Sequence, residues 1–160
     1  MKSSSWKDYV EIIGIAAIVA SLIFVGLQMK QSQQIALSAI YQARSDSSMA
    51  IRMAPLESET LLSARTKQRN GEGDSLTLEE QTALRSLLIG QITYLENVHY
   101  QYINGFISEE HWQTNREEIK GILRREPGLR ESVSSICRVF RESFCDEFQR
   151  AAEIVETELQ

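Results

Sequence analysis

The chain has few of the residues that several common protein classes require. Its 160 residues include two cysteines, two prolines and eight glycines. Two cysteines cannot supply a four-thiolate zinc site or a disulfide scaffold, and so little glycine and proline leaves few tight turns for a β-sandwich. A net charge of −5 argues against a general nucleic-acid-binding protein, which needs a basic face.

Signatures of catalysis are also missing. The sequence has no Gly-x-Ser-x-Gly, no P-loop, no dinucleotide-binding fingerprint and no His-Glu-x-x-His. These absences favour a non-enzymatic protein without a cofactor. The 42% of apolar residues and 24% of charged residues exclude wholesale disorder, and the length fits one domain of ordinary size.

The most informative segment is the uncharged apolar run Ile12–Met29, which Glu11 and Lys30 bound. As a helix its eighteen residues rise about 27 Å, close to the thickness of a bilayer's hydrocarbon core. Trp6 and Tyr9 precede it, and aromatic residues favour the membrane interface. The segment predicts a single uncleaved transmembrane helix.

A cleaved signal peptide and a buried core helix are the alternatives. Lys2 and Lys7 suit a signal peptide, but Asp8 and Glu11 do not, and the nearest small-residue cleavage pattern, at 36–38, lies well beyond the apolar run. A core helix normally has a polar face, which this segment lacks.

The orientation follows from the basic residues on the two flanks. Lys2 and Lys7 precede the span, whereas Lys30 alone follows it before Arg44. The positive-inside rule therefore places the N-terminus in the cytoplasm and the main domain outside.

Gly14, Ala17, Ser21 and Gln28 share one face of the predicted span. Small residues let a second helix approach, and serine or glutamine can hydrogen-bond across the contact. The stripe indicates self-association or a partner membrane protein; ordinary membrane-helix composition is the alternative reading.

The rest of the chain predicts an all-α fold. One helix should run from about Tyr9 to Ala54 and stop at Pro55. Residues 1–30 then form the tail and membrane anchor. Residues 31–160 form a helical bundle domain, in which residues 31–54 are a stalk that continues the same helix. We expect four to five further helices with 3.6-residue apolar periodicity, at about Ser58–Gln68, from the Thr77–Glu80 capping box to Asn104, from Ser108 to Pro127, at Leu129–Phe140, and from Ser143 onward.

Several segments resemble a family of small uncharacterised bacterial proteins with a single N-terminal span. The resemblance is carried by Phe24–Gln31, Tyr41–Arg44, Leu76–Glu80, Leu95–Tyr102 and Gly105–Trp112. Leu129–Val133 departs from the family, whose members carry bulky aromatic residues there. The resemblance implies a protein of the bacterial inner membrane with a helical domain, and it implies no activity and no functional residue.

Glu96 and His99 form the chain's one Glu-x-x-His pair. Residues three apart share a helix face, and di-iron bundles take metal ligands from such pairs. Those bundles need a second pair and two further glutamates, so a structural polar pair is the alternative reading.

Hydrogen-bonding aromatic residues gather between residues 94 and 112. Tyr100, Tyr102 and Trp112 could anchor a partner, because such side chains bury large areas and keep a polar tip. They could equally fill a helix-pair core.

Cys137 and Cys145 could form a disulfide outside the cytoplasm, or they could remain buried thiols.

Two functional hypotheses follow. The first is a membrane-anchored, non-enzymatic interaction or accessory protein that contacts the lipid bilayer and either copies of itself or a partner membrane protein, but no nucleic acid. The second is a ligand- or metal-binding helical bundle centred on Glu96 and His99.

Overall fold

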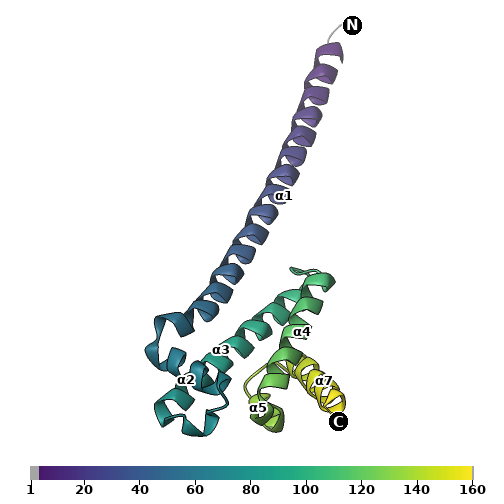
Figure 1. Cartoon of the computed structure of the whole chain (residues 1–160). Helices are drawn as coiled ribbons and strands as arrows, with labels where there is room; N and C mark the ends of the chain where they lie inside the picture. Colours follow the sequence, from purple (N-terminus) through teal and green to yellow (C-terminus); the bar gives the residue numbers. More distant parts are fainter. Residues whose placement is uncertain (1–3, 160) are drawn as a thin grey trace. The chain divides into compact units, whose positions relative to one another are not determined.

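The computed structural model describes residues 4–159, and this part of the chain contains helices but no strand. Lys2, which enters the orientation argument, lies outside the described residues. Figure 1 follows the helices along the chain. They are α1 (Ser4–Glu57), α2 (Glu59–Arg69), the short 3-10 helix η1 (Gly73–Ser75), α3 (Leu78–Ile103), α4 (Glu109–Arg125), α5 (Pro127–Glu131), α6 (Val133–Ile136) and α7 (Glu142–Glu158).

The apolar run and the predicted stalk form one uninterrupted helix, α1. An 18-residue window of α1 has a mean hydropathy of 2.5, and none of that window is buried against the rest of the chain. By length and composition this helix could cross a membrane.

The predicted stop at Pro55 is wrong by two residues, because α1 continues to Glu57 with Pro55 inside its last turn. A proline so near the C-terminus removes only one hydrogen bond from the helix. The chain leaves the helical conformation at Ser58, which has φ −125° and ψ 115° and caps α2.

The chain divides into two compact units, residues 1–43 and residues 44–160. The first unit is the N-terminal part of α1. The second, called here the helical domain, contains the C-terminal turns of α1 and every later element.

The core of the helical domain lies between α3, α4 and α7. Each contributes an apolar stripe, as the periodicity predicts, and Leu129 and Val133 add apolar side chains from the following turns. The largest side chains under 2% exposed are Trp112, Phe144, Phe148, Ile92, Leu95, Ile119, Ile122 and Leu123.

The helix boundaries follow local signals in the sequence. Ser58 and Ser108 accept hydrogen bonds from backbone amides in the first turns of α2 and α4. At α3 the predicted capping box is present, with Glu80 N donating to Thr77 Oγ1 at 3.2 Å and Thr77 N donating to Glu80 Oε2 at 2.8 Å.

Glycines end α2 and α3. Gly71 and Gly105 have φ values of 78° and 76°, which residues with a Cβ rarely adopt. After α3, Phe106 N donates to Gln101 O and Gly105 N donates to Tyr102 O, the paired hydrogen bonds of a Schellman motif.

Two expectations near the C-terminus need correction. The single helix predicted over 129–140 is two short helices, α5 and α6, with Phe140 after them packed partly against the core. Ser132 ends α5 and precedes α6 without a side-chain cap. The last helix begins at Glu142 after Arg141, not at a Ser143 cap, because Arg141 takes the extended conformation.

Replacing Thr77 by alanine should lower the free energy of unfolding of the helical domain by about 1 kcal/mol, because one amide of the first turn of α3 loses its partner. Urea titrations that follow the fluorescence of Trp112, in a Trp6→Phe background, measure this loss. Thr82→Ala is the matched control, since its hydroxyl bonds only to the Leu78 carbonyl within the helix. Equal stabilities of the two variants would contradict the role of the cap.

Candidate functional site

The structure gives Glu96 and His99 different surroundings. The Glu96 carboxylate pairs with Arg141, next to α7. The His99 ring is buried and lies 5.0 Å from the Trp112 ring and 5.8 Å from the Phe144 ring, between centroids. Among the described residues, no three His, Cys, Asp or Glu side chains are arranged to hold a metal ion.

Burial also sets the protonation of His99. Removing the imidazolium from water lowers the pKa of His99, and the nearby Glu147 and Glu96 only partly oppose this effect. A neutral, ring-packed histidine is a core residue in this position.

The three aromatic candidates for a partner surface also separate. Trp112 is fully buried, so it offers no surface to a partner in this structure. Tyr102 is half-buried, stacks on Trp112 at 5.6 Å between ring centroids, and donates its hydroxyl hydrogen to Glu109. Tyr100 is exposed, and the Arg141 guanidinium lies 4.2 Å from its ring centroid.

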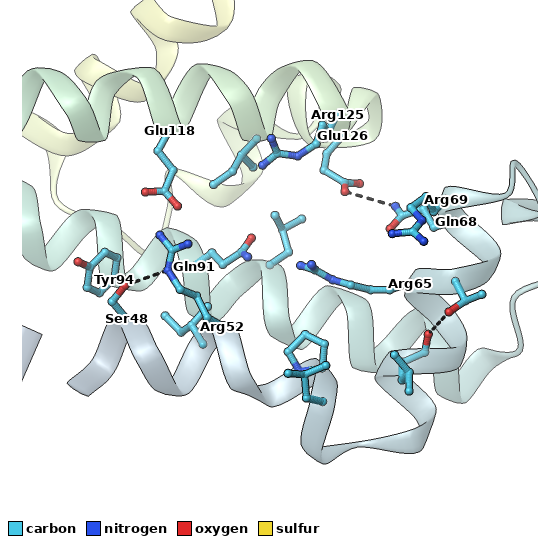
Figure 2. Close-up of a pocket in the computed structure, with 17 residues that line it drawn as sticks. Ser48, Arg52, Arg65, Gln68, Arg69, Gln91, Tyr94, Glu118, Arg125 and Glu126 are labelled. Atoms are coloured by element: carbon cyan, nitrogen blue, oxygen red, sulfur yellow. Dashed lines mark hydrogen bonds between the residues drawn. The ribbon is translucent and has the colours of Figure 1, made fainter. Parts of the chain in front are cut away.

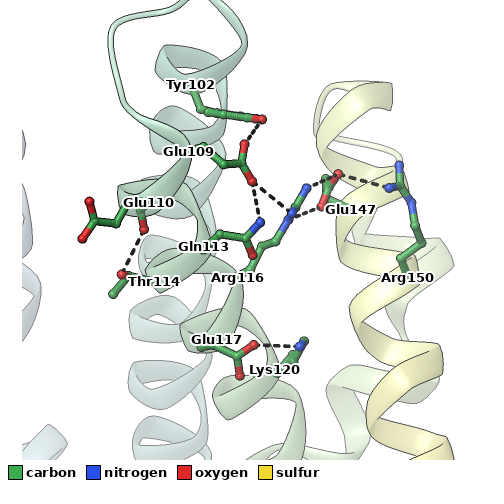
Figure 3. A network of polar contacts seen from close by, with 10 residues as sticks. All are labelled: Tyr102, Glu109, Glu110, Gln113, Thr114, Arg116, Glu117, Lys120, Glu147 and Arg150. Atoms are coloured by element: carbon green, nitrogen blue, oxygen red, sulfur yellow. Dashed lines mark hydrogen bonds and ion pairs between the residues drawn. The ribbon is translucent and has the colours of Figure 1, made fainter.

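A network of charges joins α3, α4 and α7 around these rings, as Figure 3 shows. Arg116 binds Glu147 through two hydrogen bonds of 2.8 and 3.1 Å and also approaches Glu109. Arg150 pairs with the same Glu147 from the next turn of α7. The two hydrogen bonds between Arg116 and Glu147 hold α4 against α7, and they pair the charges of both side chains.

Cys137 and Cys145 are free thiols that lie close together. The Cys145 thiol donates to the Cys137 carbonyl oxygen at 3.4 Å. Burial and the neighbouring Cys145 raise the pKa of Cys137 to about 12, which leaves it protonated and unreactive near neutral pH.

The small-residue stripe lies on the exposed N-terminal part of α1. Gly14, Ala17, Ser21 and Gln28 are all exposed, and a Cβ built on Gly14 would meet no atom within 4 Å. Within the described residues nothing covers this face.

The sequence reasoning missed a large hollow of the helical domain. This hollow, called here the arginine groove, has a volume of about 940 Å³ and lies between the last turns of α1 and helices α2, α3 and α4. Figure 2 shows Arg52, Arg65, Gln91 and Arg125 extending from these helices into the space between them. Its apolar lining is Ile51, Pro55, Leu56, Leu62, Leu88 and Ile122.

Four guanidinium groups line the arginine groove, on Arg52, Arg65, Arg69 and Arg125. Within the described part of the chain, none of the four has a carboxylate oxygen within 4.0 Å.

Two acidic residues also line the arginine groove. Glu126 accepts a hydrogen bond from Gln68 at 3.3 Å, and Glu118 is exposed. The groove is therefore net positive, on a chain whose net charge is −5.

Outside the groove, several arginines are neutralised. Arg116, Arg124, Arg141 and Arg150 each pair with a glutamate. Arg85, Arg130 and Arg138 also have no carboxylate oxygen within 4.0 Å among the described residues, but only the groove brings four such groups to one hollow, between α1, α2 and α4.

A second hollow of about 500 Å³ adjoins the groove and is called here the leucine hollow. The two hollows share the side chains of Arg65, Gln68, Leu88, Gln91 and Glu126. The lining of the leucine hollow is half apolar and half polar. Its apolar members include Leu76, Leu84, Leu87, Ile92, Leu129 and Ile136, and its polar members include Gln81, Arg85, Ser132 and Ser135.

Only a weak signal in the sequence could have revealed the groove. Arg65 and Arg69 are four residues apart, so they share a face of α2. Arg52 and Arg125 come from segments far away in the chain, and only the fold brings them to the same hollow.

Comparison with known proteins finds no protein family, no curated protein and no solved structure that matches this chain. The candidate site therefore rests on the geometry and charge of the arginine groove.

The stability of the helical domain should fall as the pH drops below 6.5. The pKa of His99 is lower in the folded protein than the usual 6.5, so the unfolded chain binds the proton first. The contribution of neutral His99 is complete above pH 6.5 and is lost as the pH falls towards the folded pKa.

Urea titrations between pH 7.5 and 5 test this effect in the wild type and in His99→Phe, which should lose part of the pH dependence while keeping an aromatic ring in the core. His111→Gln should also lose part of the pH dependence, because burial lowers the pKa of His111 too, and it measures that separate contribution. An unchanged slope in His99→Phe would show that His99 is not the titrating group.

Proposed function

We propose that this protein is a single-span protein of the bacterial inner membrane whose helical domain binds a partner or ligand and catalyses no reaction. The observation that carries the proposal is the unburied apolar segment of α1. Residues such as Ile13, Leu22 and Leu27 are 67%, 66% and 63% exposed, on different sides of the helix. A continuous apolar surface of this kind is stable only when lipid or another protein covers it.

The ends of the apolar segment support a membrane position. Trp6 and Tyr9 lie before it and are each 66% exposed, where their rings can reach the interface. Lys30 follows it, and a lysine at the end of a span can extend its ammonium group to the headgroups. The basic residues of the N-terminal flank favour a cytoplasmic N-terminus, with the helical domain outside.

The helical domain supports a binding role. Its most distinctive surface is the arginine groove, which combines apolar side chains with four guanidinium groups that have no carboxylate partner among the described residues. The metal-binding alternative lacks a similar observation, since Glu96 pairs with Arg141 and His99 packs among rings.

Membrane integration can be tested by alkaline carbonate extraction of cell membranes. The wild type should stay in the pellet, whereas a variant carrying both Val19→Asp and Leu22→Asp should be released, because a charge near the centre of a span costs about 2.5–3.5 kcal/mol on insertion scales. A carbonate-soluble wild type would overturn the proposal. A C-terminal alkaline phosphatase fusion, active only outside the cytoplasm, reports the orientation.

Self-association through the span is the second testable part of the proposal. Gly14, Ala17 and Ser21 would let two backbones approach, and packing and polar contacts between membrane helices contribute about 0.6–2 kcal/mol each. Ala17→Ile combined with Ser21→Ile should therefore reduce cross-linked dimers while leaving membrane insertion intact.

The matched control is Ala16→Ile combined with Ala20→Ile. Each of these positions lies one residue, or about 100°, away from its counterpart on the helix. If both double variants cross-link like the wild type, the stripe is ordinary membrane-helix composition.

A further inference from the structure

We propose that the arginine groove and the leucine hollow together bind one single-chain anionic amphiphile, with a carboxylate or phosphate head among the arginines and an apolar chain in the leucine hollow. This inference rests on the proposed binding role of the helical domain, but not on its anchoring in the membrane. It names the chemical class of the ligand.

The charge of the groove selects an anionic head. Arg65 and Arg69 lie four apart on α2, and like charges at that spacing repel each other. Arg52 from α1 and Arg125 from α4 line the same hollow, which adds further positive charge. A guanidinium group matches carboxylate and phosphate oxygens with two parallel hydrogen bonds, so an anion here would relieve the repulsion and gain charge-assisted contacts.

The position of the apolar surface selects a chain attached to that head. Leu88 and Gln91, on α3, border both the arginine groove and the leucine hollow. A chain that starts at the arginines can therefore pass Leu88 and reach Leu84 and Ile136. The volumes of the two hollows, about 940 and 500 Å³, each lie within the range of small-ligand sites, about 300–1,000 Å³.

The two halves of the site favour an amphiphile over simpler occupants. Inorganic phosphate would leave the leucine hollow uncovered, and a neutral hydrocarbon would leave four guanidinium groups without an anion. The acidic residues of the groove do not compensate these groups, since Glu126 is bonded to Gln68 and Glu118 has no arginine within 4.0 Å among the described residues.

The experiment uses the full chain in nanodiscs of zwitterionic lipid, with decanoate, decyl phosphate and decanol as probes, and titration calorimetry corrected for empty nanodiscs. We expect one anion per chain, bound at least about tenfold more tightly than decanol, since hydrogen bonds to charged groups are stronger than neutral ones. The preferred anion distinguishes a free fatty acid from a phosphate-headed lipid. Octanoate, decanoate and dodecanoate should differ by up to about fourfold in affinity for each buried methylene.

Variants separate the site from unspecific partitioning. Arg65→Gln combined with Arg69→Gln should weaken decanoate binding at least about tenfold, and Leu84→Gln should reduce the dependence on chain length. Arg138→Gln removes one exposed charge outside both hollows and should bind like the wild type. Thermal unfolding of each variant confirms that its domain is folded.

Three results would overturn the proposal. The first is equal affinity for decanol and decanoate, and the second is equal binding by the double arginine variant and the wild type. The third is a polyglutamate peptide that binds as tightly as decanoate, which would mark the groove as a protein-docking surface. Carbonate extraction of the same variants separates this proposal from the proposed membrane anchoring. A protein that stays in the membrane but binds no amphiphile contradicts the proposed ligand and leaves the anchoring intact.

Discussion

The helical domain depends on the apolar face of α4, which lies between α3 and α7. Trp112, Ile119 and Leu123 have no exposed surface, so this single helix provides much of the core that its two neighbours share. Helices α3 and α7 therefore each need an apolar surface only on the face that contacts α4. The C-terminal half of α3 supplies Leu95, Val98 and His99 to this core, while its N-terminal half contacts α2 instead.

The two halves of α3 explain why a hollow exists. Near its start, α3 is held to α2 by Glu80, whose carboxylate accepts hydrogen bonds from Ser63 at 2.7 Å and Lys67 at 2.8 Å. These partners and the Thr77 amide lower the pKa of Glu80 to about 2, so the contact stays ionised in mildly acidic solution. Because α2 is tied to one half of α3 and α4 to the other, the space between α2 and α4 is left to the long side chains of the arginine groove.

Local signals made much of the secondary structure predictable. The Thr77–Glu80 capping box, the Ser108 cap and the Asn104–Gly105 stop act over a few residues, and all three are where the sequence places them. The errors at Pro55 and over 129–140 arise where a local preference is weak against the packing of neighbouring segments, as with the partly buried Phe140. The groove could not be predicted, because its charges come from three helices whose neighbourhood is a property of the fold.

The arginines of the domain differ in their partners: Arg116 bonds to Glu147 beside Trp112, whereas the four arginines of the groove have no carboxylate partner among the described residues. Around Trp112, the Tyr102 ring stacks on the indole, and Arg116 lies over the indole and bonds to Glu147. Among the described residues, the indole nitrogen of Trp112 is the one buried side-chain nitrogen or oxygen without a hydrogen-bond partner. Aromatic packing on both sides of this ring offsets the missing hydrogen bond. The charges of Arg116 and Glu147 are therefore used within this part of the domain. The guanidinium groups of the arginine groove are exposed and have no carboxylate within 4.0 Å among the described residues, so their charge remains available to an anion from solution.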